Sequence, residues 1–549
     1  APKTVVENDA GIPYYCYHPG LSIVGSCRLC LAEISIPNPR TRQLEPISKL
    51  VPTCSTTAVD GMVVSTQTPK AIANQKFCME CFLLSHPLDC PVCDKAGECK
   101  LQDYSYGYGN SESRFIEDKV KNPVKDIGPT VKLYADRCVF CSRCVRFCKE
   151  VPGTAELGWV GRGATQEIAI YPGRPLDNEM AANVVDLCPV GALVEKDFLF
   201  RQRSWYLVAV PSIDGITASG DNIWIDQSNN RVYRIRPRPN PEINKWWISD
   251  EIRASWKHVH SNLRLSKPSL FQGGAHVECT WECALSKLCE RFVNIVKARG
   301  PGSLMLLVSP MLSCEDAYLL GHTLRSFDPA AVLGIGPIPM RGQDKTIPGE
   351  YTLFAEKCPN SRGVRKALEL VAGSTASASS PHADSSGNAP EVSAPGHVFS
   401  YAECLSMLAD AHSKCGSLVV TGNYPDPWMS DELQRAFDDK FVVAIDALSN
   451  GVTAKADVAL PATPWAEKSG TFLSARNHLQ HFERAILPFR EARSEGQIAG
   501  DLLAALEHRS AASFDAVAVR RQMGGIFVSD VRYADERRPT GSVMQFTEL

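Results

Sequence analysis

Hydrophobic residues in the second half of the chain gather in short runs separated by mixed polar segments. Ser303–Pro310 and Ser417–Gly422 are mainly apolar and have the length of buried strands. The second run is followed by a loop, Asn423–Pro427, and by a helix start near Ser430, and Phe441–Leu448 is again apolar. Strand, helix and strand in this order form a βαβ unit, so we expect a parallel sheet with helices on both faces.

The N-terminal part has shorter and less regular hydrophobic runs. Ser22–Val24 and Leu29–Ile36 predict strands, and Phe77–Leu84 predicts a helix followed by a compact group of Cys and His. Between Ala372 and Gly396 the chain consists mainly of Ser, Ala, Pro and Gly, which predicts a disordered insertion. The pattern changes near residue 205, where strand–helix alternation begins.

Length and charge narrow the class of protein. A chain of 549 residues is too long for one core, so several domains are expected. A net charge of −3 gives no overall attraction to nucleic acid or to an anionic membrane. No run of 18 apolar residues exists, which excludes a membrane-spanning helix. The 21 cysteines could form disulfides in a secreted protein, but the CxxC groups and the length favour a reducing compartment with metal sites.

The cysteines are concentrated near the N-terminus, where eleven of them and one histidine form three groups of four. The groups are Cys16, Cys27, Cys30 and Cys54; His86, Cys90, Cys93 and Cys99; and Cys138, Cys141, Cys144 and Cys188. Cysteine runs of this kind hold iron–sulfur clusters. Three groups without an obvious substrate site indicate an electron-transfer protein.

The first group has the order of a ferredoxin [2Fe–2S] site, with three thiolates in a loop and one distant return. The spacing is Cys16-x10-Cys27-x2-Cys30-x23-Cys54, whereas plant-type ferredoxins have a first gap of four. A zinc ribbon also uses four thiolates, but it usually has two CxxC pairs, and only one is present here.

The second group, His86-x3-Cys90-x2-Cys93-x5-Cys99, contains one imidazole. A neutral imidazole in place of a thiolate lowers the negative charge on a cluster, and in Rieske centres the same exchange raises the potential. The spacing alone leaves a structural zinc site open.

The third group begins like a bacterial ferredoxin, with Cys138, Cys141 and Cys144 two residues apart, and has two candidates for its fourth ligand. Cys148 has the expected spacing but lacks the following Pro. Cys188 is distant but is followed by Pro189. Only one of them is needed.

Four positive side chains surround the third group: Arg137, Arg143, Arg146 and Lys149. They could offset the negative charge of a cluster, or they could form a solvated face. The sequence leaves both interpretations open.

Several segments resemble the large iron–sulfur subunit of respiratory complex I, NADH:ubiquinone oxidoreductase, and occur in the same order. They are CYHPGLSIVGSCRLCLAEI, HPLDCPVCDKAGECKLQDYS, DLCPVGAL and ADVALPATPWAEKSGTFLSARNHLQ. The resemblance implies one [2Fe–2S] cluster on the first group and [4Fe–4S] clusters on the second and third, with Cys188 as the fourth ligand and Cys148 spare. It also implies that Cys78 and Cys81 are packed thiols.

The resemblance implies a fold with α+β N-terminal iron–sulfur domains followed by an α/β domain. Residues 1–76 would form a [2Fe–2S] ferredoxin-like domain, 77–115 a [4Fe–4S] domain with His and Cys ligands, and 116–200 a [4Fe–4S] ferredoxin-like domain. Residues 201–549 would form a molybdopterin-oxidoreductase-like scaffold. Its entrance region, 213–235, contains no cysteine, and no pterin-site metal ligand can be assigned, so the scaffold is expected to lack molybdopterin.

The function that the resemblance implies is electron relay from NADH and FMN toward quinone, with no substrate-converting site in this chain. Expected partners are the other subunits of the peripheral arm, including the FMN/NADH-binding subunit and downstream iron–sulfur subunits. The expected location is the matrix side of the mitochondrial inner membrane, or the cytoplasmic face of the membrane in a bacterium. The His86 cluster is expected to lie off the main route.

One alternative is the iron–sulfur subunit of an NAD-linked hydrogenase or formate dehydrogenase. Such a subunit would need cysteine or selenocysteine motifs that are not visible after Cys188. Another alternative is a zinc-stapled structural scaffold.

One departure from the family concerns the first domain. Only fifteen residues precede Cys16, where the family has a β-hairpin, and the return from Cys30 to Cys54 is longer than usual. We therefore expect another chain, or further residues, to complete the ferredoxin sheet, because its edge would otherwise be open to pairing.

The remaining cysteines are expected not to bind metal. His276, Cys279, Cys283 and Cys289 could be drawn as a fourth site, but a helix over Cys279–Cys289 would spread these side chains too far apart. The isolated thiols are expected in the core; they are Cys314, Cys358, Cys404 and Cys415.

Overall fold

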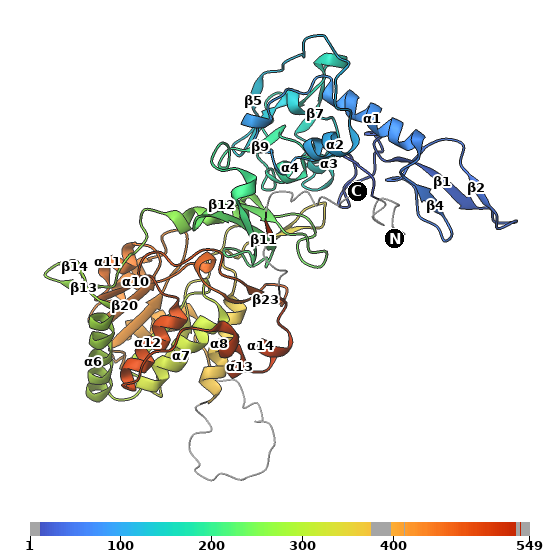
Figure 1. Ribbon diagram of the computed structural model, residues 1–549. Helices are drawn as coiled ribbons and strands as arrows, with labels where there is room; N and C mark the ends of the chain where they lie inside the picture. The colour runs from blue at the N-terminus through green and yellow to red at the C-terminus, as the bar shows by residue number, and fades with distance from the viewer. Residues whose placement is uncertain (1–10, 375–396, 411, 534–537, 540–549) are drawn as a thin grey trace.

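The computed structural model describes residues 11–374, 397–410 and 412–533, and the backbone of 538–539. Two bodies of unequal size follow each other along the chain (Figure 1). The smaller body contains residues 11–200, and the larger contains the C-terminal α/β domain. An antiparallel sheet lies between them.

The first segment is a small antiparallel sheet followed by a helix. Its elements are β1 (Leu31–Pro37), β2 (Leu44–Pro46), β3 (Val51–Pro52), β4 (Val63–Ser65) and α1 (Pro69–Leu83). Strand β1 pairs with each of the other three. This confirms the strand expected at Leu29–Ile36. Helix α1 begins after the N-cap Thr68, so the helix predicted from Phe77 covers only its second half.

The strand predicted at Ser22–Val24 does not form, so this prediction was wrong. The backbone N–H of Ser22 donates to the carboxylate of Glu150, 2.8 Å away and 128 residues later in the chain. Ile23 and Val24 are exposed. A side chain from another segment has taken the backbone donor that a strand partner would need.

The second and third segments consist of short elements around the remaining ligand groups. They are η2 (Cys90–Val92), α2 (Lys100–Tyr108), β5 (Val124–Asp126), β6 (Val131–Tyr134), η3 (Ala135–Arg137), α3 (Arg143–Glu150), β7 (Leu157–Val160), β8 (Glu167–Ile170), α4 (Asn183–Leu187) and β9 (Leu193–Glu195). One buried cluster contains residues of all three N-terminal segments, among them Leu29, Leu101 and Phe147. The three ligand groups therefore share a core.

The sheet between the two bodies is formed by β10 (Val208–Ile213), β11 (Asn222–Ser228) and β12 (Arg231–Pro237), with β24 (Arg538–Pro539) beside β10. The short helices α5 (Asp250–Ala254) and η6 (Ser255–His260) follow it. Its inner side packs on the C-terminal domain, where Ile225 and Val232 share a core with Trp465 and Phe482.

The C-terminal domain is built on a seven-stranded sheet in the order β14-β13-β21-β20-β19-β15-β16. The strands are β13 (Ser269–Gln272), β14 (Ala275–Glu278), β15 (Leu304–Val308), β16 (Val332–Ile335), β19 (Ser417–Thr421), β20 (Phe441–Asp446) and β21 (Val458–Pro461). The last five are parallel, and β13 and β14 form an antiparallel edge. The predicted βαβ unit is confirmed: α10 (Asp431–Arg435), capped by Ser430, lies between β19 and β20.

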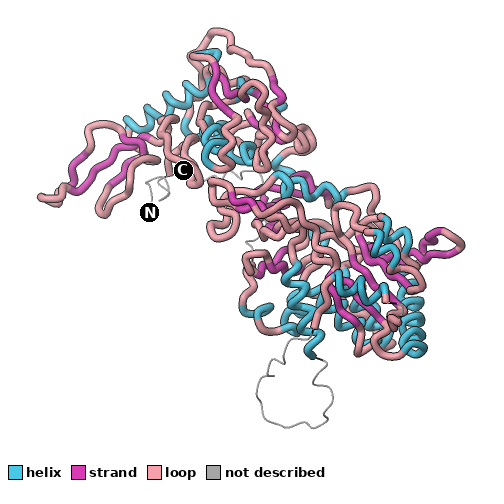
Figure 2. Tube along the Cα trace, turned by 180° about the vertical axis from the view of Figure 1, so that it is seen from behind, coloured by secondary structure: helices cyan, strands magenta, loops and turns pink. Residues whose placement is uncertain are grey.

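Helices cover both faces of this sheet (Figure 2). One face packs on α6 (Trp281–Arg299), α7 (Cys314–Phe327), α8 (Ser361–Ser374) and α12 (Glu495–Leu506), and the other on α9 (Tyr401–Ala409), α10 and α11 (Gly451–Lys455). Alternate residues of β15 serve the two cores: Leu304 and Leu306 face one, and Met305 and Leu307 face the other. This arrangement explains the continuous hydrophobic runs in the sequence.

Smaller elements complete the domain. They are β17 (Lys345–Thr346), β18 (Thr352–Leu353), β22 (Gly470–Leu473), β23 (Leu479–Phe482), α13 (Ala516–Met523) and α14 (Ile526–Ser529). Most of the insertion predicted at 372–396 lies outside the described residues, but its first three residues belong to α8, so the predicted start was too early. None of the described helices is both long and apolar enough to cross a membrane.

Candidate iron–sulfur sites

The four cysteines of the first group lie together at one end of the small sheet. Leu31 of β1 pairs with Pro52 of β3, which places Cys30 and Cys54 side by side. Cys16 Sγ and Cys27 Sγ are 3.5 Å apart. All four side chains are buried. The thiols hydrogen bond to one another, and the bond from Cys54 lowers the pKa of Cys30 to about 6. The hydrogen bond from Cys27 likewise lowers the pKa of Cys16. A compact, buried set of four thiols, two of them with a lowered pKa, fits an iron–sulfur cluster.

The second group lies nearer the surface. His86, Cys90 and Cys99 line an open cavity of about 1130 Å³, and Cys90 is exposed. Burial lowers the pKa of His86 to about 4, so its imidazole is neutral at pH 7. Its Nδ1 atom is buried and has no hydrogen-bond partner. A neutral imidazole with an unsatisfied nitrogen beside cysteines fits a metal ligand.

Cys93 is held close to the third segment rather than on the wall of that cavity. Its backbone N–H donates to Cys90 O over 3.3 Å, which keeps the two cysteines in one turn. A Cβ atom added to Gly191 would lie 2.2 Å from Cys93 Sγ. The glycine at this position therefore leaves the space that the Cys93 thiol occupies.

The third group lines one small cavity of about 20 Å³. Its four cysteines contribute to the wall together with apolar residues; the four are Cys138, Cys141, Cys144 and Cys188. The loop before α3 is tight, because Phe140 and Ser142 have φ values of 52° and 62°. Its backbone lets the Phe140 N–H approach Cys138 Sγ at 3.4 Å. Four thiols facing one water-poor space suit a buried cluster.

Cys148, the rival fourth ligand, is fully buried but does not line this cavity. Burial and the neighbouring carboxylate of Glu156 raise the pKa of its thiol. That carboxylate also accepts hydrogen bonds from Thr154 Oγ1 at 2.6 Å and Asn178 Nδ2 at 2.9 Å. The structure thus places Cys188, and not Cys148, with the other three cysteines.

The positive side chains near the third group divide into two kinds. Arg137, Arg143 and Arg146 are 3%, 6% and 9% exposed, so the solvated-face interpretation is wrong for them. Lys149 is exposed and agrees with it. The difference follows from their partners: Arg137 pairs with Asp89 at 2.9 Å, and the other two arginines donate to backbone carbonyls.

Sequence reasoning missed Arg203, which lies beside the second group. Its Nη1 atom donates to Cys93 O at 2.9 Å, and Nη2 donates to Pro91 O. It follows the third ligand group in the chain by fifteen residues and has no motif around it. No local signal could have identified it.

Most cysteines outside the three groups behave as expected. Cys314, Cys358, Cys404 and Cys415 are buried. Cys78 is buried against Arg28 O, but Cys81 is exposed, so the expectation of a packed thiol was wrong there. The cause is the register of α1, which turns position 81 toward solvent.

The four residues of the possible fourth site do not form one group, although the Cys279 and Cys283 side chains hydrogen bond to each other. Cys279 precedes α6, contrary to the expected helix, and Cys283 on its first turn is exposed. His276 Nδ1 lies 3.0 Å from Ser269 Oγ. In the part of the chain that the structure describes, no three His, Cys, Asp or Glu side chains converge as they would around one metal ion. The three ligand groups above do not converge on a single point either, as expected if each surrounds a cluster of several atoms and not one ion.

A buried carboxylate accepts several hydrogen bonds in the entrance region of the C-terminal domain. Asp214, fully buried after β10, accepts hydrogen bonds from Ile216 N at 2.9 Å, Thr217 N at 3.1 Å and Ser219 Oγ at 3.0 Å. Burial raises its pKa to about 6. Protein hydrogen bonds therefore organise this loop.

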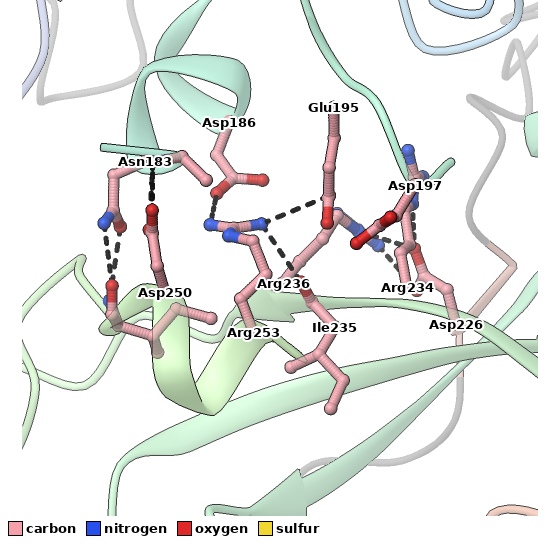
Figure 3. Close-up of polar contacts among 12 residues, drawn as sticks. Asn183, Asp186, Glu195, Asp197, Asp226, Arg234, Ile235, Arg236, Asp250 and Arg253 are labelled. Carbon is pink, nitrogen blue, oxygen red and sulfur yellow. Dashed lines mark hydrogen bonds and ion pairs between the residues drawn. The ribbon is translucent and has the colours of Figure 1, made fainter. Parts of the chain in front are cut away.

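A network of ion pairs joins the N-terminal body to the middle sheet (Figure 3). Arg253 of α5 contacts Asp186 at the end of α4 and lies 3.8 Å from Glu195 of β9. Arg234 of β12 pairs with Glu98, next to Cys99, at 2.7 Å. Both arginines are nearly inaccessible to solvent. The pairs fix the second and third ligand groups against the same sheet.

Family models match consecutive parts of the chain. The 2Fe-2S iron-sulfur cluster binding domain matches residues 3–69, and the NADH-ubiquinone oxidoreductase-G iron-sulfur binding region matches 75–114. The ferredoxin-like domain of NADH-quinone oxidoreductase subunit 3 matches 128–194. The NDSU1/NuoG-like 4Fe-4S domain matches 207–257, and the molybdopterin oxidoreductase model matches 403–505. The predicted fold class is confirmed by this order.

Curated relatives agree with the family models. A component of the NADH-quinone oxidoreductase of Rickettsia felis is 38% identical over 314 residues, which are 57% of this chain and 45% of that protein. The NADH-ubiquinone oxidoreductase 75 kDa subunit of Reclinomonas americana is 39% identical over 57% of this chain and 43% of its own length. The chain is homologous to the large iron–sulfur subunits of complex I. The predicted resemblance is thereby confirmed.

The homology covers part of each protein. The iron-sulfur protein 1 of mitochondrial NADH dehydrogenase [ubiquinone] from Solanum tuberosum is 41% identical over 51% of this chain and 36% of its own length. The matched segments thus span less than half the length of these complex I subunits. A crystal structure of an NAD+-reducing [NiFe]-hydrogenase, 27% identical, covers 37% of this chain and 85% of its own, with a TM-score of 0.32. A likeness at that score supports no functional argument.

Proposed function

We propose that the chain is an electron-transfer subunit of an NADH:ubiquinone oxidoreductase, with one [2Fe–2S] and two [4Fe–4S] clusters. The observation that supports this most strongly is the third group, whose four cysteines line one small cavity although Cys188 is 44 residues from Cys144. The similar proteins are subunits of NADH-quinone and NADH-ubiquinone oxidoreductases, so the electrons would come from NADH, through FMN, and go to quinone. The chain would have no substrate-converting site of its own.

In this proposal the first group holds a [2Fe–2S] cluster through two pairs of thiolates. Cys16 and Cys27, 3.5 Å apart, would hold one iron, and the neighbours Cys30 and Cys54 would hold the other. The second and third groups would each hold a [4Fe–4S] cluster. When bound, these clusters provide one-electron carriers, and the protein fixes their positions and excludes water.

The surroundings of each group would set its potential. His86 contributes a neutral ligand to the second group, and Arg203 donates to the carbonyl of its ligand Cys93. The third group lines a cavity together with apolar side chains and Arg143, and a backbone N–H approaches Cys138 Sγ. Positive charge and hydrogen bonds favour the reduced state of a cluster, and burial without them disfavours it.

Partners and location follow from the same proposal. The chain would contact the FMN/NADH-binding subunit and downstream iron–sulfur subunits, on the matrix side of the mitochondrial inner membrane or the cytoplasmic face of a bacterial membrane. Leu88, Val92 and Phe77 are exposed around the second group, as expected of a face that a neighbouring subunit covers. The C-terminal domain would serve as a scaffold without molybdopterin.

Reductive titration tests this function. The full chain is reconstituted anaerobically with iron and sulfide and titrated with reduced methyl viologen while the visible absorbance is followed. We expect about three electrons per chain, one for each cluster. Cys99→Ser, which removes a proposed ligand, should accept about one electron fewer, whereas Cys415→Ser, a buried thiol outside the groups, should match the wild type. A reconstituted wild-type chain that accepts no electrons would refute the proposal.

A further inference from the structure

Two buried arginines of α3 connect the first ligand group to the third. Arg146 donates to Cys16 O, and its Nη2 atom is 3.4 Å from Cys141 O. Arg143 donates to Tyr17 O, and its Nη1 atom is 3.2 Å from Leu187 O. Each guanidinium therefore touches the backbone of a first-group ligand or its neighbour and the backbone of a third-group ligand or its neighbour.

These four contacts are to ligands or to residues next to them, and Arg146 also donates to Ser22 O. Cys16 and Cys141 are ligands in different segments, and Tyr17 and Leu187 directly adjoin the ligands Cys16 and Cys188. The planar guanidinium presents several donors in a fixed geometry, so one side chain can hold two carbonyls at a set separation. A lysine has the same charge but cannot reproduce that geometry.

Within the described residues, all the hydrogen bonds of the two arginines go to neutral acceptors. Arg143 and Arg146 donate to backbone carbonyls and to Ser142 Oγ, and neither forms an ion pair with a residue that the structure describes. Glu150 attracts Arg146 electrostatically, but its hydrogen bonds come from Ser22. Burying an unpaired charge is costly unless a negative group lies nearby. Thiolate-bound clusters in the first and third groups would be negative groups of this kind.

We propose that Arg143 and Arg146 are positioning residues that hold the first and third cluster sites at a fixed separation and raise the reduction potential of both. The inference rests on the proposed function, because it requires clusters at these two sites. It adds that the same two positive charges act on both of these sites. The second site is outside this pair, since the carbonyl of its ligand Cys93 receives its hydrogen bond from Arg203.

The test compares Arg146→Gln and Arg143→Gln with Arg203→Gln as the matched control. Each full-length chain is reconstituted, and the midpoint potential of every cluster is measured by EPR-monitored redox titration. Removing a positive charge disfavours the reduced state. We therefore expect Arg146→Gln to lower the reduction equilibrium constant of the first and third clusters about tenfold, or ~59 mV for a one-electron couple. Arg146→Lys, which keeps the charge, should return both potentials to near the wild-type values.

The control distinguishes the bridge, meaning the action of Arg143 and Arg146 on both the first and third sites, from a general effect of removing an arginine. Arg203→Gln should shift the second cluster alone. If Arg146→Gln and Arg143→Gln do not retain all their iron, selective loss from the first and third sites with the second site intact supports the bridge. Unchanged potentials in fully loaded variants, or an equal shift at the second cluster, would overturn it. Absence of clusters from the wild type would instead refute the proposed function.

Discussion

The choice between Cys188 and Cys148 gives the sharpest test of a single site. Cys188 lines the cavity with Cys138, Cys141 and Cys144, whereas Cys148 is buried beside Glu156. Cys188→Ser should therefore remove the third cluster, which is about four of the roughly ten iron atoms expected from one [2Fe–2S] and two [4Fe–4S] clusters. Cys148→Ser should retain all of them.

Cys188→Ser should also destabilise the protein more than Cys148→Ser does. A serine hydroxyl at position 148 can still donate to Glu156, so we expect a cost of about 1–2 kcal/mol for replacing a fully buried thiol by a hydroxyl. Loss of a cluster removes a cross-link between α3 and α4, and ligand binding is coupled to folding at such sites. Cys188→Ser should therefore unfold at lower temperature than Cys148→Ser.

Both variants are compared after the same anaerobic reconstitution. Iron and acid-labile sulfide are measured per chain, and EPR spectra are recorded after reduction with dithionite. One [4Fe–4S] signal should vanish in Cys188→Ser and persist in Cys148→Ser. The opposite result, an intact signal in the first variant and a lost signal in the second, would refute the assignment of Cys188.

Three further predictions concern packing and charge. Gly191→Ala places a methyl group 2.2 Å from Cys93 Sγ, so EPR should show loss of the second cluster although the mutation lies in the segment of the third; an unchanged second signal would contradict this packing. Glu467→Gln removes the negative charge 2.6 Å from the buried Arg264 guanidinium and should lower the free energy of unfolding by roughly 3–5 kcal/mol in urea titrations. A change below about 1 kcal/mol would argue against a buried pair. The raised pKa of Asp214, about 6 compared with an ordinary value near 4, means that the folded chain binds a proton which the unfolded chain releases at lower pH. The stability that this proton provides is complete below pH 4 and is lost as pH rises through 6. Between pH 5 and 7.5 the free energy of unfolding of the wild type should therefore fall by about 1.4 kcal/mol more than that of Asp214→Asn. Equal slopes of unfolding free energy against pH in the two proteins would exclude the effect.

Most of the ligands could be found from the sequence because they lie close together in it. Three cysteines within seven residues, as in Cys138–Cys144, can surround one point only in a tight loop, and the structure forms such a loop with Phe140 in the left-handed region. The βαβ order of the C-terminal domain was likewise visible, because parallel strands buried on both faces give continuous apolar runs.

Contacts between distant segments could not be predicted in this way. Spacing left Cys148 and Cys188 as equal candidates, and only the packing of α4 against α3 brings Cys188 to the cavity. The strand expected at Ser22–Val24 is replaced by a bond to Glu150, 128 residues away. The partners of Arg146 are equally remote, with Cys16 130 residues away. Local propensity carries no information on such partners.

The most direct test of the central claim is metal and sulfide analysis of the anaerobically isolated full-length chain, combined with EPR of the dithionite-reduced protein. The account predicts about ten iron atoms and about ten sulfides per chain, with one [2Fe–2S] and two [4Fe–4S] signals. Zinc in place of iron, with no labile sulfide and no such signals, would show that the three groups are structural metal sites and would contradict the account.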